Sequence, residues 1–172
     1  MNKTLVVSIP VFLIVGLFAS SVLADDTLVR FERGIGVIPV SSVVAGTQNA
    51  DGTFSDVNRN DVRGTPPGGQ PWVIADLSAQ VKVDGRIVVD GHGLLLAGGN
   101  NIGTNAGQSV RARLFCGAVA HDSGLVPLAP NGDFEIDDVL TPRPPNPCTN
   151  PVLLIVSRGG SWFAAGILKL DE

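Results

Sequence analysis

The sequence predicts an all-β fold, an antiparallel sandwich of two sheets, with a partly closed barrel as the alternative. Polar and apolar residues alternate with a period of two in several short stretches, as they do in strands with one buried face. Clusters of Gly, Pro, Asn and Asp separate these stretches at intervals of about 8 to 12 residues. No stretch beyond residue 24 carries the apolar stripe of a surface helix, so we expect little helix outside the first 24 residues. This combination is typical of sandwiches and barrels.

Residues 1–24 have the composition of a signal peptide. A positive charge at Lys3 precedes an apolar run over residues 5–18, and Ala24 ends the segment directly before an acidic pair. The apolar run has about 14 residues, whereas a helix that spans a membrane needs roughly 18 to 20. We therefore expect cleavage after Ala24 and a secreted or periplasmic protein. An uncleaved membrane anchor is the alternative.

The remaining part, residues 25–172, has the length of a single domain with one core. Without Lys3 it would carry 11 basic and 16 acidic side chains, a net charge of −5. Nucleic acids and anionic membranes both attract clustered Lys and Arg, so this charge argues against either as a partner after cleavage of the signal. The sequence does not identify a partner, and a protein or a surface is the kind that it leaves open.

Both cysteines, Cys116 and Cys148, lie in this domain. An exported chain reaches an oxidising compartment, so we expect a disulfide between them. It would close a loop of about 30 residues and stabilise the fold by about 3–4 kcal/mol on the chain-entropy model. A metal or redox pair is the alternative, although the spacing has no CxxC and no adjacent histidine.

Two segments are too rich in turn residues for regular strands. Residues 41–71 contain many Gly, Asn, Asp, Ser and Pro and only scattered apolar residues, which predicts a long loop or a weak hairpin over the surface. Residues 141–151 contain five prolines and must be extended and irregular.

The clearest periodic signal spans residues 72–98 and predicts a long β-hairpin. From residue 73 to residue 83 every odd position is apolar, and every even position except Ile74 is polar. The return strand also has most of its apolar residues at odd positions, so odd must face odd. A loop of three residues, 83–85, meets this requirement and puts Gly85 in the left-handed turn position. It pairs Val81 with Ile87 and, if the register continues, Asp76 with His92.

The last two expected strands, residues 152–157 and 161–168, are apolar at odd and even positions alike. Strands with this composition are covered on both faces. We therefore place these two strands in the middle of the fold.

The first candidate site is the polar face of the hairpin, with Asp76, Asp90 and His92. A carboxylate beside an imidazole is the minimum for a general base or a metal ligand. Gly91 and Gly93 flank His92 and would let a ligand approach the backbone or let a bulge redirect the ring. The alternative interpretation is a solvated sheet face.

The second candidate is a calcium loop formed by Asp56, Asn58, Asn60 and Asp61, whose alternating oxygen ligands resemble the start of such a loop. The motif requires a glycine after its third ligand, and here Asp61 stands in that place. A polar turn is the alternative. We therefore expect no cofactor, with calcium as the one alternative.

The third candidate is the acidic stretch at residues 133–138. Asp133, Glu135 and Asp137 share one face of the expected strand, as paired glycosidase carboxylates or cation ligands would. A charged edge strand that resists aggregation explains the same residues without chemistry.

The sequence contains no nucleophile motif and no metal-ligand spacing, and it has only two histidines. We therefore expect a non-catalytic binding or structural module of unknown ligand. One alternative is a secreted enzyme or metal-binding protein with its site on the hairpin face or on the carboxylates of residues 133–138. A second alternative is a surface protein that self-assembles through edge strands.

Overall fold

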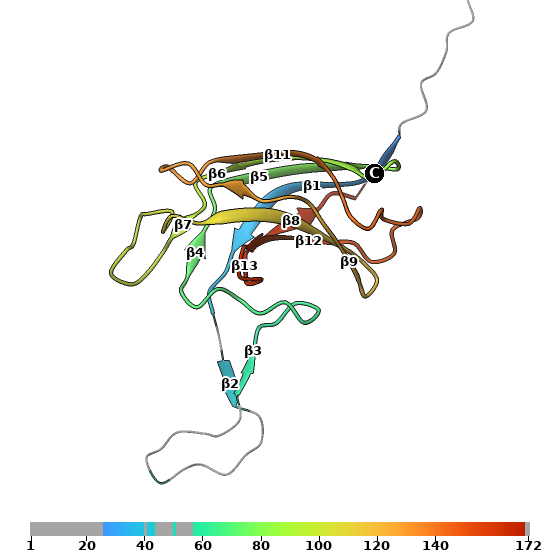
Figure 1. The fold of residues 1–172 in the computed structure, drawn as a ribbon. Coiled ribbons are helices and arrows are strands. Elements are labelled where there is room, and N and C mark those ends of the chain that lie inside the picture. The colour runs from blue at the N-terminus through green and yellow to red at the C-terminus, as the bar shows by residue number, and fades with distance from the viewer. Residues whose placement is uncertain (1–25, 40, 44–49, 51–56, 171–172) are drawn as a thin grey trace, which may run out of the picture.

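The computed structural model describes residues 26–39, 41–43, 50 and 57–170, and all regular structure in these residues is β (Figure 1). One antiparallel sheet has nine strands, and two further sheets have two strands each. The strands are β1 (Thr27–Gly36), β2 (Ser41–Val43), β3 (Val57–Arg59), β4 (Trp72–Val73), β5 (Asp76–Lys82), β6 (Arg86–His92), β7 (Leu95–Leu96), β8 (Ser109–Cys116), β9 (Val119–Asp122), β10 (Val126–Pro127), β11 (Phe134–Val139), β12 (Val152–Ser157) and β13 (Trp162–Leu168). The predicted all-β class is confirmed.

The large sheet curls into a half-barrel. Its strand order is β10-β8-β12-β13-β1-β5-β6-β11, with β9 paired to β8. In Figure 1, β5, β6 and β11 form the upper layer, and β8, β12 and β13 lie below them. The two layers expected of a sandwich are therefore parts of one sheet, which corresponds to the partly closed barrel.

The two ends of this sheet meet without a regular ladder. Asp122, at the end of β9, and Thr141, just after β11, exchange two backbone hydrogen bonds of 2.9 Å. Nearby, the Gly124 amide donates to the Asp138 carboxylate at 2.6 Å. We call this junction the seam.

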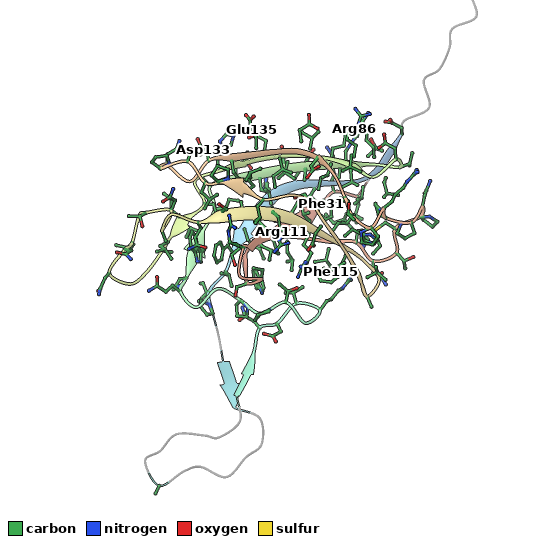
Figure 2. The ribbon with its side chains drawn as sticks, viewed as in Figure 1. Phe31, Arg86, Arg111, Phe115, Asp133 and Glu135 are labelled. Carbon is green, nitrogen blue, oxygen red and sulfur yellow. A yellow bond between two sulfur atoms is a disulfide. The ribbon has the colours of Figure 1, made fainter. Side chains whose placement is uncertain are left out.

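The core lies between the two layers and is built from the alternate residues that the strands turn inward. Phe31 points into this space in Figure 2 and is 1% exposed. The larger fully buried side chains, in this core and on the covered outer side of β12, are Phe31, Leu77, Leu94, Ile87, Leu114, Ile136, Leu140, Leu153, Leu154 and Ile155. These side chains stabilise the fold through the apolar area that they remove from water, at about 25 cal/mol per Å².

The hairpin has the predicted register. Val81 pairs with Ile87 and Asp76 pairs with His92. The Gly85 amide donates to the Lys82 carbonyl at 2.9 Å, and its φ is 91°. The three-residue loop is confirmed.

The sequence pattern had suggested that odd-numbered residues are buried along the whole hairpin. The structure differs beyond β5 and β6. Trp72 pairs with Leu96 in a separate sheet with the register unchanged, yet these even-numbered residues are buried and Val73 is half exposed. The faces exchange where Gly93 adopts a φ of 64°, because a left-handed residue bends the strand and interrupts the pleat.

The last two strands lie in the middle of the sheet, as predicted. Leu153 and Ile155 face the barrel core, whereas Leu154 and Val156 point to the other side and are still fully buried. The segment between β3 and β4 covers this second side: Trp162 donates its indole N–H to the Asn60 carbonyl at 3.2 Å.

The Cys116–Cys148 disulfide is formed, as predicted. Cys116 ends β8, and Cys148 lies in the proline-rich segment, which has no strand between residues 142 and 151. The Arg143 guanidinium donates to the Val83 carbonyl at the hairpin tip. The proline-rich segment therefore runs as an irregular strap from the hairpin tip to the disulfide.

Candidate functional site

The candidate residues of the hairpin and of the acidic stretch come together on one outer surface because β11 pairs with β6. This pairing places Glu135 opposite Asp90 and Asp137 opposite Val88. Figure 2 shows Glu135 pointing outward from the upper layer. We call this surface the acidic face, and it consists of Asp76, Asp90, Asp133, Glu135 and Asp137 around His92.

His92 stands between two carboxylates. Its Nε2 lies 3.3 Å from Asp90 Oδ2, and its Nδ1 lies 3.5 Å from Asp133 Oδ1. The negative charge of Asp90, followed by that of Asp133, raises the pKa of His92 above its ordinary value of 6.5. The imidazole side chain is 50% exposed, so these ion pairs are screened by solvent.

Asp133 is held by the turn that precedes β11. Its Oδ1 accepts a hydrogen bond from the Gly93 amide at 3.0 Å, and its Oδ2 accepts one from the Asn131 side chain at 2.6 Å. The Gly93 bond is the largest cause that lowers the pKa of Asp133. The carboxylate is therefore fixed in position and ionised well below neutral pH.

The remaining members of the acidic face differ in how they are held. Asp76 lies opposite His92 and accepts a hydrogen bond from the next backbone amide at 2.9 Å. Glu135 and Asp137 are exposed and form no ion pair with any residue that the structure describes.

Glu32 extends the acidic face and was not among the predicted residues. β1 pairs with β5 and sets Glu32 opposite Ser78, in the row that continues through Asp90 to Glu135. The alternation of apolar and polar residues over 29–32 was a usable signal, but the neighbour of β1 could not be read from it. Glu32 also forms an ion pair with Lys169.

The two glycines beside His92 serve packing and backbone shape. A Cβ at Gly91 would lie 2.2 Å from the Phe134 ring, so the phenyl group occupies the space of the missing side chain. Gly93 takes a left-handed φ and donates to Asp133. Both glycines therefore have a role in the fold, while ligand access or a bulge that redirects the ring stays a prediction.

Only part of the proposed calcium loop can be placed. Asp56 and the side chain of Asn58 lie outside the described residues. Asn60 donates its side-chain amide to the Ile38 carbonyl at 3.1 Å, and Asp61 is exposed. Within the described ranges, no group of three or more His, Cys, Asp or Glu side chains is arranged to hold a metal ion.

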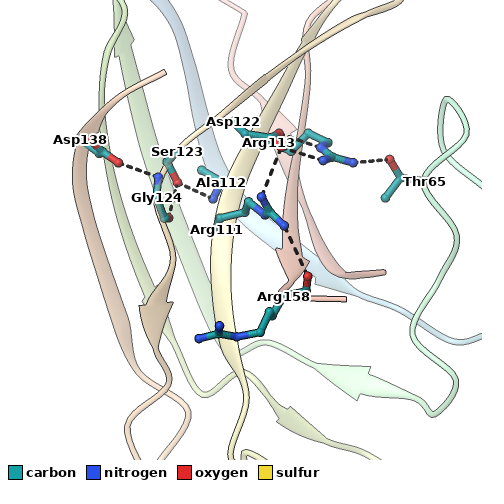
Figure 3. Close-up of polar contacts among 9 residues, drawn as sticks. All are labelled: Thr65, Arg111, Ala112, Arg113, Asp122, Ser123, Gly124, Asp138 and Arg158. Atoms are coloured by element: carbon teal, nitrogen blue, oxygen red, sulfur yellow. Dashed lines mark hydrogen bonds and ion pairs between the residues drawn. The ribbon is translucent and has the colours of Figure 1, made fainter. Parts of the chain in front are cut away.

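A second polar cluster lies on the outer side of β8 and β9 (Figure 3). Arg113 forms two hydrogen bonds of 2.7 Å with the Asp122 carboxylate and a longer one of 3.3 Å to Thr65. Arg111 lies 3.7 Å from the same carboxylate. These contacts tie the covering segment to the sheet, which is a structural role.

The other histidine, His121, is separate from both clusters. It is 2% exposed, and its Nδ1 lies 2.6 Å from the Pro142 carbonyl oxygen. That bond anchors the start of the strap to β9.

The acidic face can hold a cationic group between carboxylates, and His92 can change its charge near neutral pH. Among the residues described, no helix has the length and apolar character needed to cross a membrane. Comparison with known proteins finds no matching family model, no matching curated sequence and no matching solved structure.

Proposed function

We propose that this chain is an exported, non-catalytic binding module, and that its acidic face binds a basic segment of a protein partner. The signal-like composition of residues 1–24 and the disulfide support an extracytoplasmic location. The acidic face supplies the binding surface.

The observation that carries the proposal is the cross-strand pair of Asp90 and Glu135. Side chains that are directly opposite in an antiparallel sheet have Cβ atoms about 5 Å apart, and like charges in this arrangement destabilise the sheet. His92 compensates Asp90, but Glu135 has no cationic partner among the described residues. Local conflicts of this kind are typical of functional positions, and a bound cation would relieve this one.

A hollow beside this pair indicates which cation fits. It has a volume of about 300 Å³, and its lining includes Arg30 and Glu32 of β1, Ser78 and Gln80 of β5, and Val88 of β6. Val88 is 48% exposed. A lysine or arginine side chain can lay its aliphatic part on Val88 and extend its charged end between the two carboxylates.

A hydrolase or a metal site on the same surface remains the alternative function. His92 with Asp90 and Asp133 favours the hydrolase, because an imidazole between two carboxylates can accept a proton, whereas the described residues contain no group of three or more such side chains arranged to hold a metal ion. Titration with Ca²⁺ and Zn²⁺ in place of a peptide tests this alternative on the same protein.

The test uses a fluorescent oligo-arginine peptide and fluorescence anisotropy, together with the free energy of unfolding in urea. Glu135→Gln removes one charge of the like-charged pair. We expect peptide binding to weaken about two- to fivefold, because an exposed charge pair contributes about 0.5–1 kcal/mol. We expect the unfolding free energy to rise by a few tenths of a kcal/mol, about the size of the repulsion removed.

Two controls separate site-specific binding from general attraction. Asp137→Asn removes a charge from the same strand opposite Val88, so it should weaken binding without raising stability. Asp61→Asn removes an equal charge from an exposed position in the segment below the barrel (Figure 1). Equal weakening by Asp61→Asn and Glu135→Gln would refute the acidic face as the binding surface.

A further inference from the structure

A cavity on another part of the molecule does not involve the acidic face. It has a volume of about 270 Å³ and lies where β4, the 101–108 loop and the turn after β12 meet. Pockets for drug-sized ligands have volumes of about 300–1,000 Å³. This cavity is slightly smaller than the lower limit, so it has room for one small ring.

Every residue that lines this cavity is uncharged. Gln70, Asn101 and Gln108 contribute carboxamides, and Ser157 and Ser161 contribute hydroxyl groups. The side-chain carboxamides of Gln70 and Asn101 form no hydrogen bond with another described residue, so both can bind a ligand. The Ser157 hydroxyl accepts a hydrogen bond from the Ser161 amide at 3.1 Å and can still donate its proton.

The floor of the cavity is apolar and close-packed. Trp72 and Phe163 stack with their ring centroids 4.0 Å apart and their planes at 13°. Gly68 lies directly against both rings, because a Cβ at this position would be 3.0 Å from Phe163 and 3.2 Å from Trp72. Because Gly68 has no side chain, its backbone can pack directly on the two rings.

Backbone hydrogen bonds hold the walls in place before any ligand arrives. Gly68 donates to the Trp162 carbonyl at 2.9 Å, which fixes one wall to β13. Leu96 donates to Thr104 at 2.9 Å and accepts from Gly103 at 2.8 Å, which fixes the opposite loop. A site whose walls are already ordered loses less entropy when it binds.

We infer that this cavity binds a neutral saccharide unit. Carboxamides and hydroxyls can each donate and accept, which suits the paired hydroxyl groups of a sugar ring. Trp72, Phe163 and Leu96 are only 4%, 6% and 4% exposed, so the floor offers a small apolar area to the C–H side of the same ring. An uncharged lining disfavours a charged ligand, since a charge leaving water would find no partner there.

The experiment is saturation-transfer difference NMR on the folded protein with a panel of glucose, galactose, mannose and N-acetylglucosamine. We expect saturation transfer to at least one of them and perturbation of the Trp72 indole resonance. Asn101→Ala should weaken the binding of that sugar about two- to tenfold, the equivalent of one hydrogen bond. Asn100→Ala is the matched control, because Asn100 is exposed in the same loop and does not line the cavity.

A second variant blocks the cavity without removing a hydrogen bond. Gly69 lines the cavity with nothing within 4 Å of an added Cβ and has no left-handed φ, so Gly69→Leu should fold normally and abolish binding. Ala118→Leu is its control, at an exposed position in the turn between β8 and β9 that does not line the cavity. No transfer to any sugar of the panel, or transfer that survives Gly69→Leu, would overturn the inference.

Discussion

The packing of Phe134 on Gly91 permits a quantitative test of how β11 joins the barrel. The two residues are directly opposite in the β6–β11 ladder. A methyl group at position 91 would lie 2.2 Å from the ring Cζ and 2.3 Å from Cε1. Carbon atoms in contact are about 3.5–4 Å apart, so the overlap exceeds 1 Å and the ring must move. We expect Gly91→Ala to destabilise the protein by about 1–3 kcal/mol, the usual cost of overpacking.

A double-mutant cycle isolates this clash. Phe134→Ala alone should cost about 3–5 kcal/mol through the cavity it leaves. The double variant should be more stable than the sum of the two single effects predicts, by about 1–3 kcal/mol, because the new methyl group then has room. Urea unfolding at neutral pH, followed by tryptophan fluorescence, gives all four free energies. Strictly additive effects would show that the phenyl ring does not occupy the glycine position.

Three further predictions concern the disulfide, the imidazole and β1. Replacing Cys116 and Cys148 together by Ser should lower the unfolding free energy by about 3–4 kcal/mol, since the bond spans 32 residues; a loss below 1 kcal/mol in urea unfolding would contradict this. An NMR titration should give His92 a pKa above 6.5, and Asp90→Asn should lower it. The folded-state pKa is the raised one, so the contribution of His92 to stability is present below about pH 6.5 and is lost as the pH rises through the folded pKa. An unchanged pKa in the variant would contradict the ion pair. Gly36→Ala should cost at least about 2 kcal/mol by thermal or urea unfolding, because its Cβ would lie 2.1 Å from a backbone oxygen of Trp72; a neutral effect would show that β1 does not pass so close to β4.

The sequence predicted features that depend on neighbouring residues. The pairing of Val81 with Ile87 follows from alternation and from the chemistry of a three-residue loop, and both are local. The opposition of Asp76 and His92 follows from the same register. The disulfide followed because only two cysteines were present.

Features that depend on distant pairing could not be predicted. The contact between His92 and Asp133 requires β11 to pair with β6. The sequence of neither strand identifies the other as its pairing partner. The place of Glu32 beside Ser78 has the same origin. The exchange of faces along the hairpin depends on the left-handed φ of Gly93, and a glycine in a sequence does not reveal which φ it adopts.

Because the barrel is closed only by the seam in the described part of the chain, the acidic residues of β11 also affect the self-association of the protein. β11 is the last strand of the sheet order, and beyond it the barrel closes through a few contacts at the ends of the strand. An edge of this kind is a template for another chain, and charged side chains are a common protection against such pairing. Neutralising both Glu135 and Asp137 should therefore promote association of barrels at high protein concentration, detectable by sedimentation velocity, whereas a variant that stays monomeric would show that the seam alone closes the edge.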